Sequence, residues 1–584
     1  MSRLSLTVSL LTAAVACGLD PAAADFTPVS DAMLENPAPG DWLMWRRTLN
    51  SWGFSPLDQI NRDNVGELAL VWTHGLADGI QEGTPLVHDG IMFMPNPGDV
   101  IQSFDAATGD LRWEYRRKWP DDLKANIPFP TINRTLAIYG TTIIDLTADD
   151  YVIALDAATG KPVWETKILD YTVHHAQQSS GPITARGKVI SGRNCEPVGI
   201  PDACVVTAHD ANTGKELWRR HLIPKPDEPG GDSWRDLPYE QRRHVGAWMV
   251  PSFDSGLNRV FVGTSVTAPA PKYMLAGNDK QYLYHNSTLA LDADTGEIVW
   301  YYQHLVDHWD LDHPFERLLV DTAVAPDASE VTWINPKLKP GERRKVVTGI
   351  PGKTGVVYTL DRETGEFLWA RPTVKQTVVA NIDGATGAVT VNPDMLFTGV
   401  RQTRVVCPSS NGGKNFQAGA YSPLSNVMYY SLQNTCMRVT SIAEKPDPKE
   451  IYQISVRGQF PEGVDKIGTV YAISAETGRT AWKYEQRAAM TSLMATAGGL
   501  VFGGDSNGRF RAFDEKTGEV LWEINLGAGV TGYPVTFAVG GRQYVAVSTG
   551  TAVATTGLNL MAPELRPGSA NNLFVFALPV VDQR

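Results

Sequence analysis

The chain has 584 residues, of which 43% are hydrophobic and 20% are charged, and its formal net charge is −12. This composition is typical of a folded soluble protein and excludes a disordered or collagen-like chain. The acidic balance also excludes the basic surface on which nucleic-acid binding depends, so we expect no nucleic-acid partner.

The first 24 residues differ from the rest of the chain. Arg3 precedes an apolar run over residues 4–16, and small residues end the segment. This arrangement is typical of a secretory signal peptide, and the run is shorter than the ~20 apolar residues of a transmembrane helix. We predict that residues 1–24 are a signal peptide and that residues 25–584 are exported without a transmembrane segment. The alternatives are an apolar N-terminal strand or anchor, or lipidation at Cys17.

Four cysteines follow the predicted signal peptide: Cys195, Cys204, Cys407 and Cys436. An even number of cysteines in an exported protein suggests two disulfides, and four cysteines allow three pairings. Proximity in the sequence favours the pairs Cys195–Cys204 and Cys407–Cys436.

The pattern Asp-x-x-Thr-Gly-x-x-x-Trp recurs along the chain. Six copies begin at Asp105, Asp156, Asp210, Asp292, Asp361 and Asp514, and a seventh has Ser474 in place of Asp. A strand-like run precedes each copy and a second one leads to the tryptophan, which predicts a hairpin. Asp and Thr can bond to the local backbone in its turn, and Gly supplies a positive φ. The tryptophan can then pack against the neighbouring unit.

Such units cannot bury both faces alone, and antiparallel four-stranded units stack radially into a propeller. The 113-residue interval between Trp369 and Trp482 is about two units wide, Trp72 resembles part of an earlier, degenerate unit, and the spacing of the repeats suggests eight blades. We therefore predict an all-β fold, an eight-bladed β-propeller with tryptophan-docking repeats, in which residues 25–584 form one domain. At about 70 residues a blade, the blades must carry long loops, which usually hold the functional residues.

Beyond the repeats, the sequence resembles the quinoprotein alcohol dehydrogenases, the methanol and ethanol dehydrogenase family that uses pyrroloquinoline quinone (PQQ). The likeness begins at Asp41-Trp42, includes Gln59-Ile60-Asn61, and ends near Gln543-Tyr544-Val545. It covers nearly all of the chain after the predicted signal peptide. The resemblance implies an eight-bladed propeller in the periplasm, with PQQ and a metal ion near its axis.

The resemblance also implies which residues contact PQQ: Glu82, Arg134, Ser179, Trp248, Lys353 and Asn415. PQQ is a flat tricyclic ortho-quinone with three carboxylates, so its site needs cations, hydroxyls and a flat wall. The guanidinium of Arg134 can donate two parallel hydrogen bonds to a carboxylate, and the indole of Trp248 offers a face for stacking. A surface ion pair is the alternative for Arg134. A cation at Lys353 would polarise the quinone oxygens.

The segment His308-Trp309-Asp310-Leu311-Asp312-His313 carries the expected catalytic base. By resemblance, Asp310 takes the alcohol proton while hydride passes to C5 of PQQ, and a metal ion acts as Lewis acid on that carbonyl. The products are a reduced quinol and an aldehyde or ketone. If the segment is extended, Asp310 and Asp312 point the same way and could face one ion.

The resemblance assigns metal ligation to Glu196 and Asp310, and it identifies Asp312 as the mark of the lanthanide-using branch. Hard carboxylate oxygens suit Ca²⁺ or a trivalent lanthanide and not zinc. The alternative for Asp312 is an acceptor that does not touch the metal.

Three departures from the family pattern affect the site. Pro128-Phe129 replaces a vicinal cysteine pair, and Val266-Thr267 stands where a metal-ligating asparagine is usual, so Thr267 or a backbone carbonyl is the expected substitute. Arg193 replaces a serine, and residues 195–204 carry an insertion that methanol dehydrogenases lack. These changes, with the long loop over residues 267–284, favour a bulkier secondary alcohol, as in relatives that oxidise lupanine-type alkaloids or trichothecene toxins such as deoxynivalenol.

The chain contains no Cys-x-x-Cys-His motif and therefore no covalent haem of its own. The resemblance then implies that electrons leave to a separate periplasmic cytochrome c. Two other functions are compatible with the repeats: a non-catalytic propeller scaffold of the cell envelope, and a quinoprotein sugar dehydrogenase. A scaffold, however, has no need to keep Glu196, Trp248 and Asp310 together with the cations Arg134 and Lys353.

Overall fold

The computed structural model describes residues 26–196, 198–447 and 449–580, so the predicted signal peptide lies outside the described residues. Strands dominate, and the prediction of an all-β fold is confirmed. The described α-helices are short: α1 (Asp31–Glu35), α2 (Leu123–Asn126), α3 (Tyr171–His174) and α4 (Val553–Asn559). None of the described helices has the length and apolar character needed to cross a membrane.

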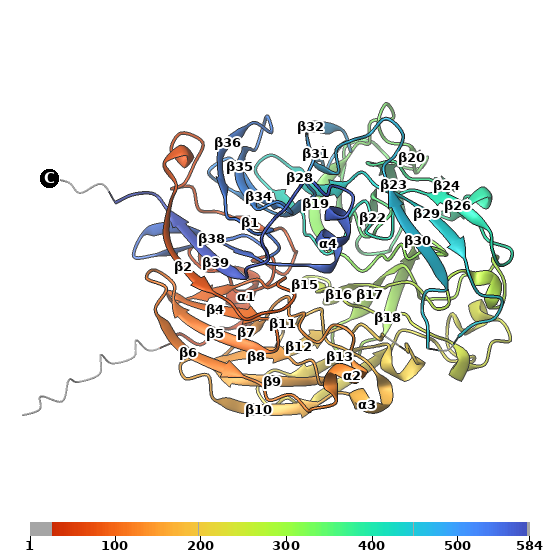
Figure 1. The fold of residues 1–584 in the computed structure, drawn as a ribbon, viewed down its shortest axis with the longest axis horizontal. Coiled ribbons are helices and arrows are strands. Elements are labelled where there is room, and N and C mark those ends of the chain that lie inside the picture. Colours follow the sequence, from red (N-terminus) through yellow and green to blue (C-terminus); the bar gives the residue numbers. More distant parts are fainter. Residues whose placement is uncertain (1–25, 197, 448, 581–584) are drawn as a thin grey trace, which may run out of the picture.

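The described residues form ten sheets, eight of which have four or five strands. In Figure 1 the sheets follow one another around the centre of the molecule in chain order. The first four each contain four consecutive strands: β3 (Leu86–His88), β4 (Ile91–Asn96), β5 (Val100–Asp105), β6 (Leu111–Arg116); β7 (Ala137–Tyr139), β8 (Thr142–Leu146), β9 (Tyr151–Asp156), β10 (Pro162–Lys167); β11 (Ile183–Ala185), β12 (Lys188–Ser191), β13 (Val205–Asp210), β14 (Glu216–His221); β15 (Ser252–Asp254), β16 (Arg259–Gly263), β17 (Ser287–Asp292), β18 (Ile298–Gln303).

The other four large sheets are also built from antiparallel strands, and two of them gain a strand from the start of the chain. They contain β19 (Leu318–Val324), β20 (Trp333–Ile334), β21 (Glu342–Gly349), β22 (Val356–Asp361), β23 (Phe367–Pro372); β27 (Ala420–Ser422), β28 (Val427–Gln433), β31 (Gly468–Ser474), β32 (Thr480–Gln486); β33 (Met490–Thr496), β34 (Leu500–Asp505), β35 (Arg509–Asp514), β36 (Val520–Asn525) with β1 (Phe54–Ser55); and β37 (Val535–Val539), β38 (Arg542–Thr549), β39 (Asn572–Ala577) with β2 (Ala69–Gly75). Of the two added strands, β1 pairs parallel with β33, and β2 pairs antiparallel with β39.

The interval between Trp369 and Trp482 does not contain a further tryptophan-bearing unit, so our reading of it as about two units is wrong. Its residues form two small sheets in addition to the inner strands β27 and β28. One small sheet pairs β24 (Val379–Ile382) with β25 (Val389–Val391), and the other joins β26 (Thr403–Val406), β29 (Cys436–Ser441) and β30 (Ile454–Gln459). The extra residues therefore form an insertion, which begins after one large sheet and is followed by the last strands of the next.

We expected Trp72 to belong to an earlier unit, and this expectation is wrong. It lies on β2, which pairs antiparallel with β39, so it forms the outer edge of the sheet that contains the last strands of the chain. The Trp72 indole donates to the carbonyl of Ala106, in the first repeat turn. The first and last parts of the chain are thus joined in one sheet, and that sheet contacts the next one through Trp72.

Trp72 and six of the seven repeat tryptophans pack on the turn of a neighbouring sheet, as the pattern predicts. A Cβ added at the turn glycine would lie between 2.4 and 3.1 Å from that indole, and all of these glycines have positive φ. The pairs are Trp72 with Gly109, Trp113 with Gly160, Trp164 with Gly214, Trp218 with Gly296, Trp300 with Gly365, Trp369 with Gly478, and Trp482 with Gly518. Only glycine provides both the left-handed backbone and the space for the indole.

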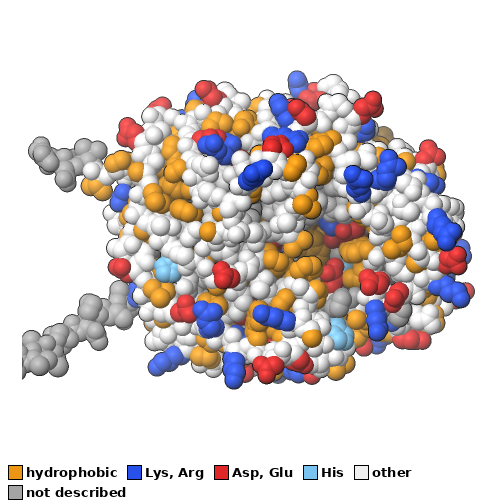
Figure 2. All heavy atoms as spheres, viewed as in Figure 1, with side chains coloured by type: hydrophobic (Ala, Val, Ile, Leu, Met, Phe, Trp, Pro, Cys, Tyr) orange, Lys and Arg blue, Asp and Glu red, His pale blue; other side chains and the backbone are white. Residues whose placement is uncertain are grey.

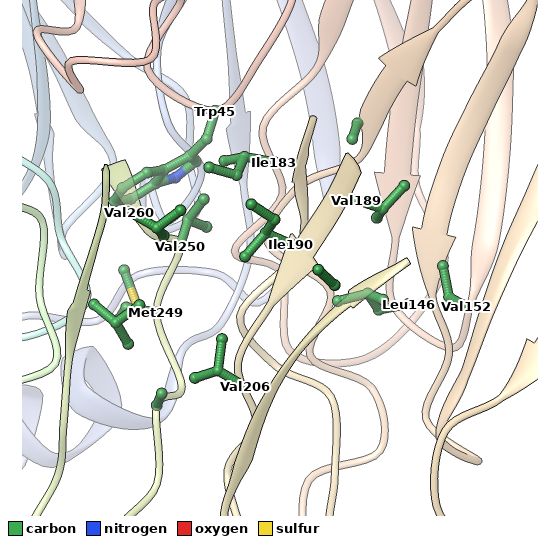
Figure 3. Close-up of a cluster of buried hydrophobic side chains, with 14 of the residues drawn as sticks. Trp45, Leu146, Val152, Ile183, Val189, Ile190, Val206, Met249, Val250 and Val260 are labelled. Carbon is green, nitrogen blue, oxygen red and sulfur yellow. The ribbon is translucent and has the colours of Figure 1, made fainter. Parts of the chain in front are cut away.

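Apolar residues from neighbouring sheets meet between the sheets and form the core. In Figure 3, Leu146 of β8, Ile190 of β12, Val206 of β13 and Val260 of β16 lie in one cluster with Trp45, which comes from the N-terminal segment. Burying such side chains stabilises the fold by roughly 25 cal/mol for each Å² of apolar surface removed from water. The N-terminal segment is therefore part of the packed core.

Both predicted disulfides are confirmed. Cys195 is bonded to Cys204, with 5.2 Å between their Cα atoms, and Cys407 is bonded to Cys436, with 4.2 Å between theirs. Glu196 lies between the two cysteines of the first disulfide in the sequence, and Asn415 lies between those of the second. Each bond therefore restrains a segment that holds a predicted site residue.

Candidate active site

A cavity of about 560 Å³ brings together every predicted site residue except Thr267. Figure 2 shows that the face of the molecule is hollowed near its centre, where hydrophobic and acidic side chains gather. The predicted residues that line the cavity are Glu82, Arg134, Ser179, Glu196, Trp248, Asp310, Asp312, Lys353 and Asn415. Pro128 and Phe129, which replace the expected cysteine pair, also line it.

The topology explains why these distant residues meet. Glu82, Arg134, Ser179 and Trp248 precede the first strands of successive sheets, namely β3, β7, β11 and β15. Asp310 similarly precedes β19, and Asn415 precedes β27. Because each of these strands begins a sheet at the centre of the molecule, the loops that lead into them converge at one end of the centre.

At one side of the cavity, Arg134 is bound by a ring of acceptors. Its Nη2 lies 2.6 Å from Oε2 of Glu82, and both side chains are at most 5% exposed. Its Nη1 donates to the carbonyls of Ser179 and Trp248. The alternative of a surface ion pair is therefore wrong for Arg134. Burial raises the pKa of Glu82, and the charge of Arg134 opposes that rise.

Trp248 contacts charged groups at both ends of the site. The guanidinium carbon of Arg134 lies 5.2 Å from its ring centroid, and its Nε1 donates to Oδ2 of Asp312 at 3.3 Å. Phe315 packs edge-on against the indole, with 5.4 Å between ring centroids, and Nζ of Lys414 lies 4.5 Å from the Phe315 ring. These contacts fix the orientation of the indole relative to the carboxylates.

At the other side, Lys353 lies between two carboxylates. Its Nζ is 2.6 Å from Oδ1 of Asp310 and 3.3 Å from Oδ2 of Asp312. Burial raises the pKa of Asp310 well above its usual value, and the charge of Lys353 opposes this. Burial alone would lower the pKa of Lys353, but the charges of Asp310 and Asp312 outweigh it and raise the pKa.

Glu196 adds a third carboxylate to this side of the cavity. Its Oε1 lies 3.7 Å from Nε2 of His244. Burial raises the pKa of Glu196, the charge of His244 opposes this, and the charge of Asp312 adds to the rise. Together with Asp310 and Asp312, Glu196 makes three carboxylates near Lys353, so the region favours an additional positive charge.

We expected Asp310 and Asp312 to face one ion if the segment that carries them is extended. The segment is not extended. Asp310 has a φ of 69° and lies in a turn that Asp307 holds. The carboxylate of Asp307 accepts from the backbone N–H groups of Trp309, Asp310 and Leu311 at 2.8–3.1 Å. Asp310 and Asp312 still line the same cavity and share Lys353 because the turn redirects Asp310.

Asp307 is thus a positioning residue that our sequence analysis missed. An Asp whose carboxylate can bond the backbone two and three residues later is a known local signal for a turn. We also missed Tyr452, which lines the cavity from the segment before β30. Burial raises the pKa of Tyr452, and the charges of Asp310, Asp312 and Glu196 add to the rise. No motif in the sequence pointed to this tyrosine.

Thr267 does not join the site, so this candidate ligand is not supported. Its hydroxyl donates to the carbonyl of Arg243 at 2.6 Å, and its own carbonyl accepts from Nζ of Lys272 at 2.6 Å. The carbonyl of Val266 is likewise bonded to His244, at 2.8 Å. What this segment contributes instead is the Val266 N–H, which donates to Oδ1 of Asp312 at 3.1 Å.

The residues present fit an anionic, oxygen-rich ligand such as PQQ. Among the described residues, Nε of Arg134, Nε2 of Gln177 and Oδ1 of Asn194 are buried without a hydrogen-bond partner, and all three residues line the cavity. Unpaired buried polar groups are costly, so a ligand that pairs with them is favoured. The cavity also supplies the indole of Trp248 and the cations Arg134 and Lys353.

The metal side fits a hard cation by its chemistry. Within residues 26–196, 198–447 and 449–580, no three His, Cys, Asp or Glu side chains form a ready-made metal cluster. Glu196, Asp310 and Asp312 nevertheless offer the oxygen donors that Ca²⁺ and lanthanides require. Burial raises the pKa of Glu196 and of Asp310, and the negative charge of Asp312 adds to both rises. A bound cation would favour the ionised form of these carboxylates.

The sequence matches a family model described as the β-propeller domain of PQQ-dependent glucose, ethanol and alcohol dehydrogenases, over residues 42–390 and 485–545. The chain belongs to the PQQ-dependent alcohol dehydrogenase family. It is 31% identical over 548 residues to the dehydrogenase subunit of alcohol dehydrogenase (quinone) from Komagataeibacter europaeus, covering 88% of this chain and 72% of the relative. It is 29% identical to the quinoprotein ethanol dehydrogenase of Pseudomonas aeruginosa, covering 95% and 93%.

Solved structures agree with this family. A europium-containing methanol dehydrogenase superposes with a TM-score of 0.84 at 26% identity, covering 94% of this chain and 100% of that chain. The quinohemoprotein alcohol dehydrogenase ADHIIG of Pseudomonas putida HK5 gives a TM-score of 0.84 at 28% identity, covering 96% and 85%. This quinoprotein alcohol dehydrogenase is thus an enzyme with a β-propeller fold and PQQ as its cofactor, and Ca²⁺ or a lanthanide ion is consistent with the matched proteins.

Proposed function

We propose that the enzyme oxidises an alcohol to a ketone or aldehyde in the central cavity, with Asp310 as the base. The observation that carries this proposal is the arrangement around Lys353, which binds Asp310 at 2.6 Å and Asp312 at 3.3 Å in the cavity that Arg134 and Trp248 also line. The cations would hold the anionic cofactor, and the carboxylates would hold the metal and receive the proton.

In this proposal, Glu82, Arg134, Ser179, Trp248, Lys353 and Asn415 would hold PQQ. The metal would be held by Glu196, Asp310 and Asp312. When bound, PQQ supplies the oxidant that takes hydride from the carbinol carbon, and the metal supplies Lewis acidity. Aromatic Trp248 offers a face to a flat ring, and its contacts with Phe315 and Asp312 restrict its rotation.

Asp310 would receive the hydroxyl proton of the substrate. Its Oδ1 accepts from Lys353, which leaves Oδ2 as the oxygen for the substrate proton. Burial makes the carboxylate a stronger base by raising its pKa, and Lys353 opposes protonation in the resting enzyme. The turn built by Asp307 holds Asp310 in place, since the Asp307 carboxylate accepts from the backbone N–H groups of Trp309, Asp310 and Leu311.

We also propose that the eight large sheets are the eight blades of the propeller, in one domain over residues 25–584. Support comes from the contacts of the repeat tryptophans, which lead from each sheet to the next, and from Trp522, whose ring lies 5.4 Å from that of Phe576 in the last sheet. Export to the periplasm by residues 1–24 and electron transfer to a separate cytochrome c complete the proposal. The sequence features given above support both.

The identity of the metal is the most direct part of the proposal to test. A third carboxylate, Asp312, beside Glu196 and Asp310 favours a trivalent ion, because the attraction grows with the product of the charges. The europium-containing methanol dehydrogenase is a structural neighbour, which supports this choice. Ca²⁺ remains the alternative that the same oxygen donors would accept.

The test is reconstitution of purified protein with PQQ and either Ca²⁺ or La³⁺, followed by dye reduction with a panel of primary and secondary alcohols. We expect turnover only when PQQ and one of the metals are both present. Asp310→Asn should bind PQQ, as measured by absorption after desalting, yet lose turnover by about a thousandfold or more, because the general base is removed. A variant with unchanged turnover would show that Asp310 is not the base.

A further inference from the structure

A second cavity of about 490 Å³ lies beside the first one, and Glu450 lines both. Its wall is largely apolar, formed by Val198, Leu237, Pro238, Met274, Leu275 and Ala276. Charged residues, among them Arg235, Asp236 and Arg243, also contribute to its lining. Concave sites of this size with an apolar wall and a few polar groups are typical of small-molecule binding.

Two walls of the second cavity come from segments by which this sequence departs from its family pattern. Val198 belongs to the segment that the Cys195–Cys204 disulfide closes, and residues 268–276 belong to the long loop that begins at Thr267. Asp447 and Glu450 lie in the segment between β29 and β30. Two of the departures from the family pattern thus meet the segment before β30 at one cavity, and none of these segments carries a tryptophan repeat.

Hydrogen bonds hold these walls together. Nζ of Lys272, which is fully buried, donates to the carbonyls of Thr267 and Pro269 at 2.6 and 3.0 Å. Ala270 exchanges backbone hydrogen bonds with Ile451 and Gln453, at 3.1 and 3.0 Å. The hydroxyl of Tyr273 donates to the carbonyl of Ala443.

The loop over residues 267–276 is therefore bonded to the segment before β30, and the second cavity is preformed. A preformed apolar site loses little affinity to ordering when a ligand binds.

The partition between the two cavities is itself apolar. Val266, Ala268 and Ile451 pack together as a small buried cluster, against which Tyr452 packs. Ile451 and Tyr452 line the first cavity, whereas Ala268 lines the second. A substrate that extends from Asp310 past Glu450, which lines both cavities, would place its apolar surface against this cluster and out of water.

We propose that the second cavity binds the body of the substrate, a bulky alcohol with an apolar ring system, while its carbinol reaches Asp310 in the first cavity. This inference rests on the proposed function. The first cavity must hold both a tricyclic cofactor and the reacting carbon, which leaves little of its 560 Å³ for a large substrate. The second cavity supplies the missing space.

The test compares decahydro-2-naphthol, a fused-ring secondary alcohol, with ethanol in the PQQ-loaded and metal-loaded enzyme. Ala276→Trp should fill the second cavity and lower kcat/KM for the ring alcohol by about tenfold or more, with ethanol changed by less than about twofold. Leu237→Gln, which keeps the volume of the wall and makes it polar, should act in the same direction. Ala385→Trp is the matched control, because Ala385 is exposed in the β24–β25 turn and lines neither cavity.

Binding provides a second readout that does not depend on turnover. Calorimetry with the ketone product, 2-decalone, should show affinity weakened by about tenfold in Ala276→Trp and unchanged in the control. Equal losses for both alcohols, no selective loss in either variant, or a wild-type enzyme that oxidises ethanol but not the ring alcohol would overturn the inference. Failure of the wild type to oxidise either alcohol with PQQ and metal would instead overturn the proposed function.

Discussion

Lys353 shows how a single side chain sets the electrostatics of this site. It neutralises one of three carboxylates and bonds to two of them, so it keeps Asp310 and Asp312 near each other despite their repulsion. The remaining negative charge is what a metal ion would compensate. The same lysine lines the cavity in which the cofactor is proposed to bind, which connects the metal side of the site with the PQQ side.

Asp312 offers a residue-level test of the metal. Asp312→Asn keeps the size of the side chain and an oxygen for the Val266 N–H, but it removes one negative charge. Because a trivalent ion loses more attraction than a divalent one, we expect La³⁺-supported activity to fall at least about tenfold further than Ca²⁺-supported activity. Calorimetric titration of the PQQ-loaded variant with each ion gives the affinities directly. Equal losses with both ions would show that Asp312 does not discriminate between them.

At the scale of the elements, the repeat turn is the feature that the sequence predicted best. Asp156 illustrates why: its Oδ1 accepts from the N–H and the hydroxyl of Thr159, and Gly160 then turns the backbone with a φ of 70°. Every interaction in this turn is local, so the residue pattern alone specifies it. Packing of Trp113 then requires only that the neighbouring sheet has the same turn.

Two glycines separate the cost of backbone strain from the cost of lost space. Gly160→Ala would place a Cβ 2.5 Å from the Trp113 ring, whereas Gly140→Ala, at a φ of 56°, would meet nothing within 4 Å. The Gly140 variant should lose about 1–2 kcal/mol of unfolding free energy from strain alone. The Gly160 variant should lose a further ~1–3 kcal/mol because the indole must move. Urea unfolding monitored by tryptophan fluorescence would measure both, and equal losses would argue against tight docking.

Long-range features were harder to predict for a physical reason. The pairing of β2 with β39 joins residues almost 500 positions apart, and no local pattern around Trp72 indicates its partner strand. The two small sheets lack the repeat tryptophan, so the interval before Trp482 could not be divided correctly. Thr267 was expected in the site by alignment, but Lys272 and Arg243, distant from any motif, hold it elsewhere.

At the scale of the whole molecule, the sheet that contains Trp72, which we had assigned to a separate unit, joins the two ends of the chain. β2 supplies its outer strand, β39 and β38 follow, and β37 lies at its other edge. Trp72 on β2 contacts the neighbouring sheet on one side, and Trp522 on β36, in the neighbouring sheet on the other side, contacts Phe576 of this sheet. All the loops that form the cavity project from sheets held in this arrangement, so separation of β2 from β39 would disturb the site as well as the fold.

A disulfide across the β2–β39 pair should therefore stabilise the molecule more than one within a single hairpin. Gly75 and Asn572 are directly opposed, and a Cβ on Gly75 would lie 3.9 Å from Oδ1 of Asn572. Gly75→Cys with Asn572→Cys would close a loop of nearly the whole chain, which should raise the unfolding free energy by roughly 4–5 kcal/mol.

The matched control is Arg509→Cys with Asn525→Cys, which are opposed within the β35–β36 hairpin and close a short loop worth about 3 kcal/mol. Calorimetric scans of both oxidised variants, with the single-cysteine variants as references, would measure the difference in Tm. A smaller rise for the β2–β39 bond than for the hairpin bond would mean that separation of these strands is not a step toward unfolding.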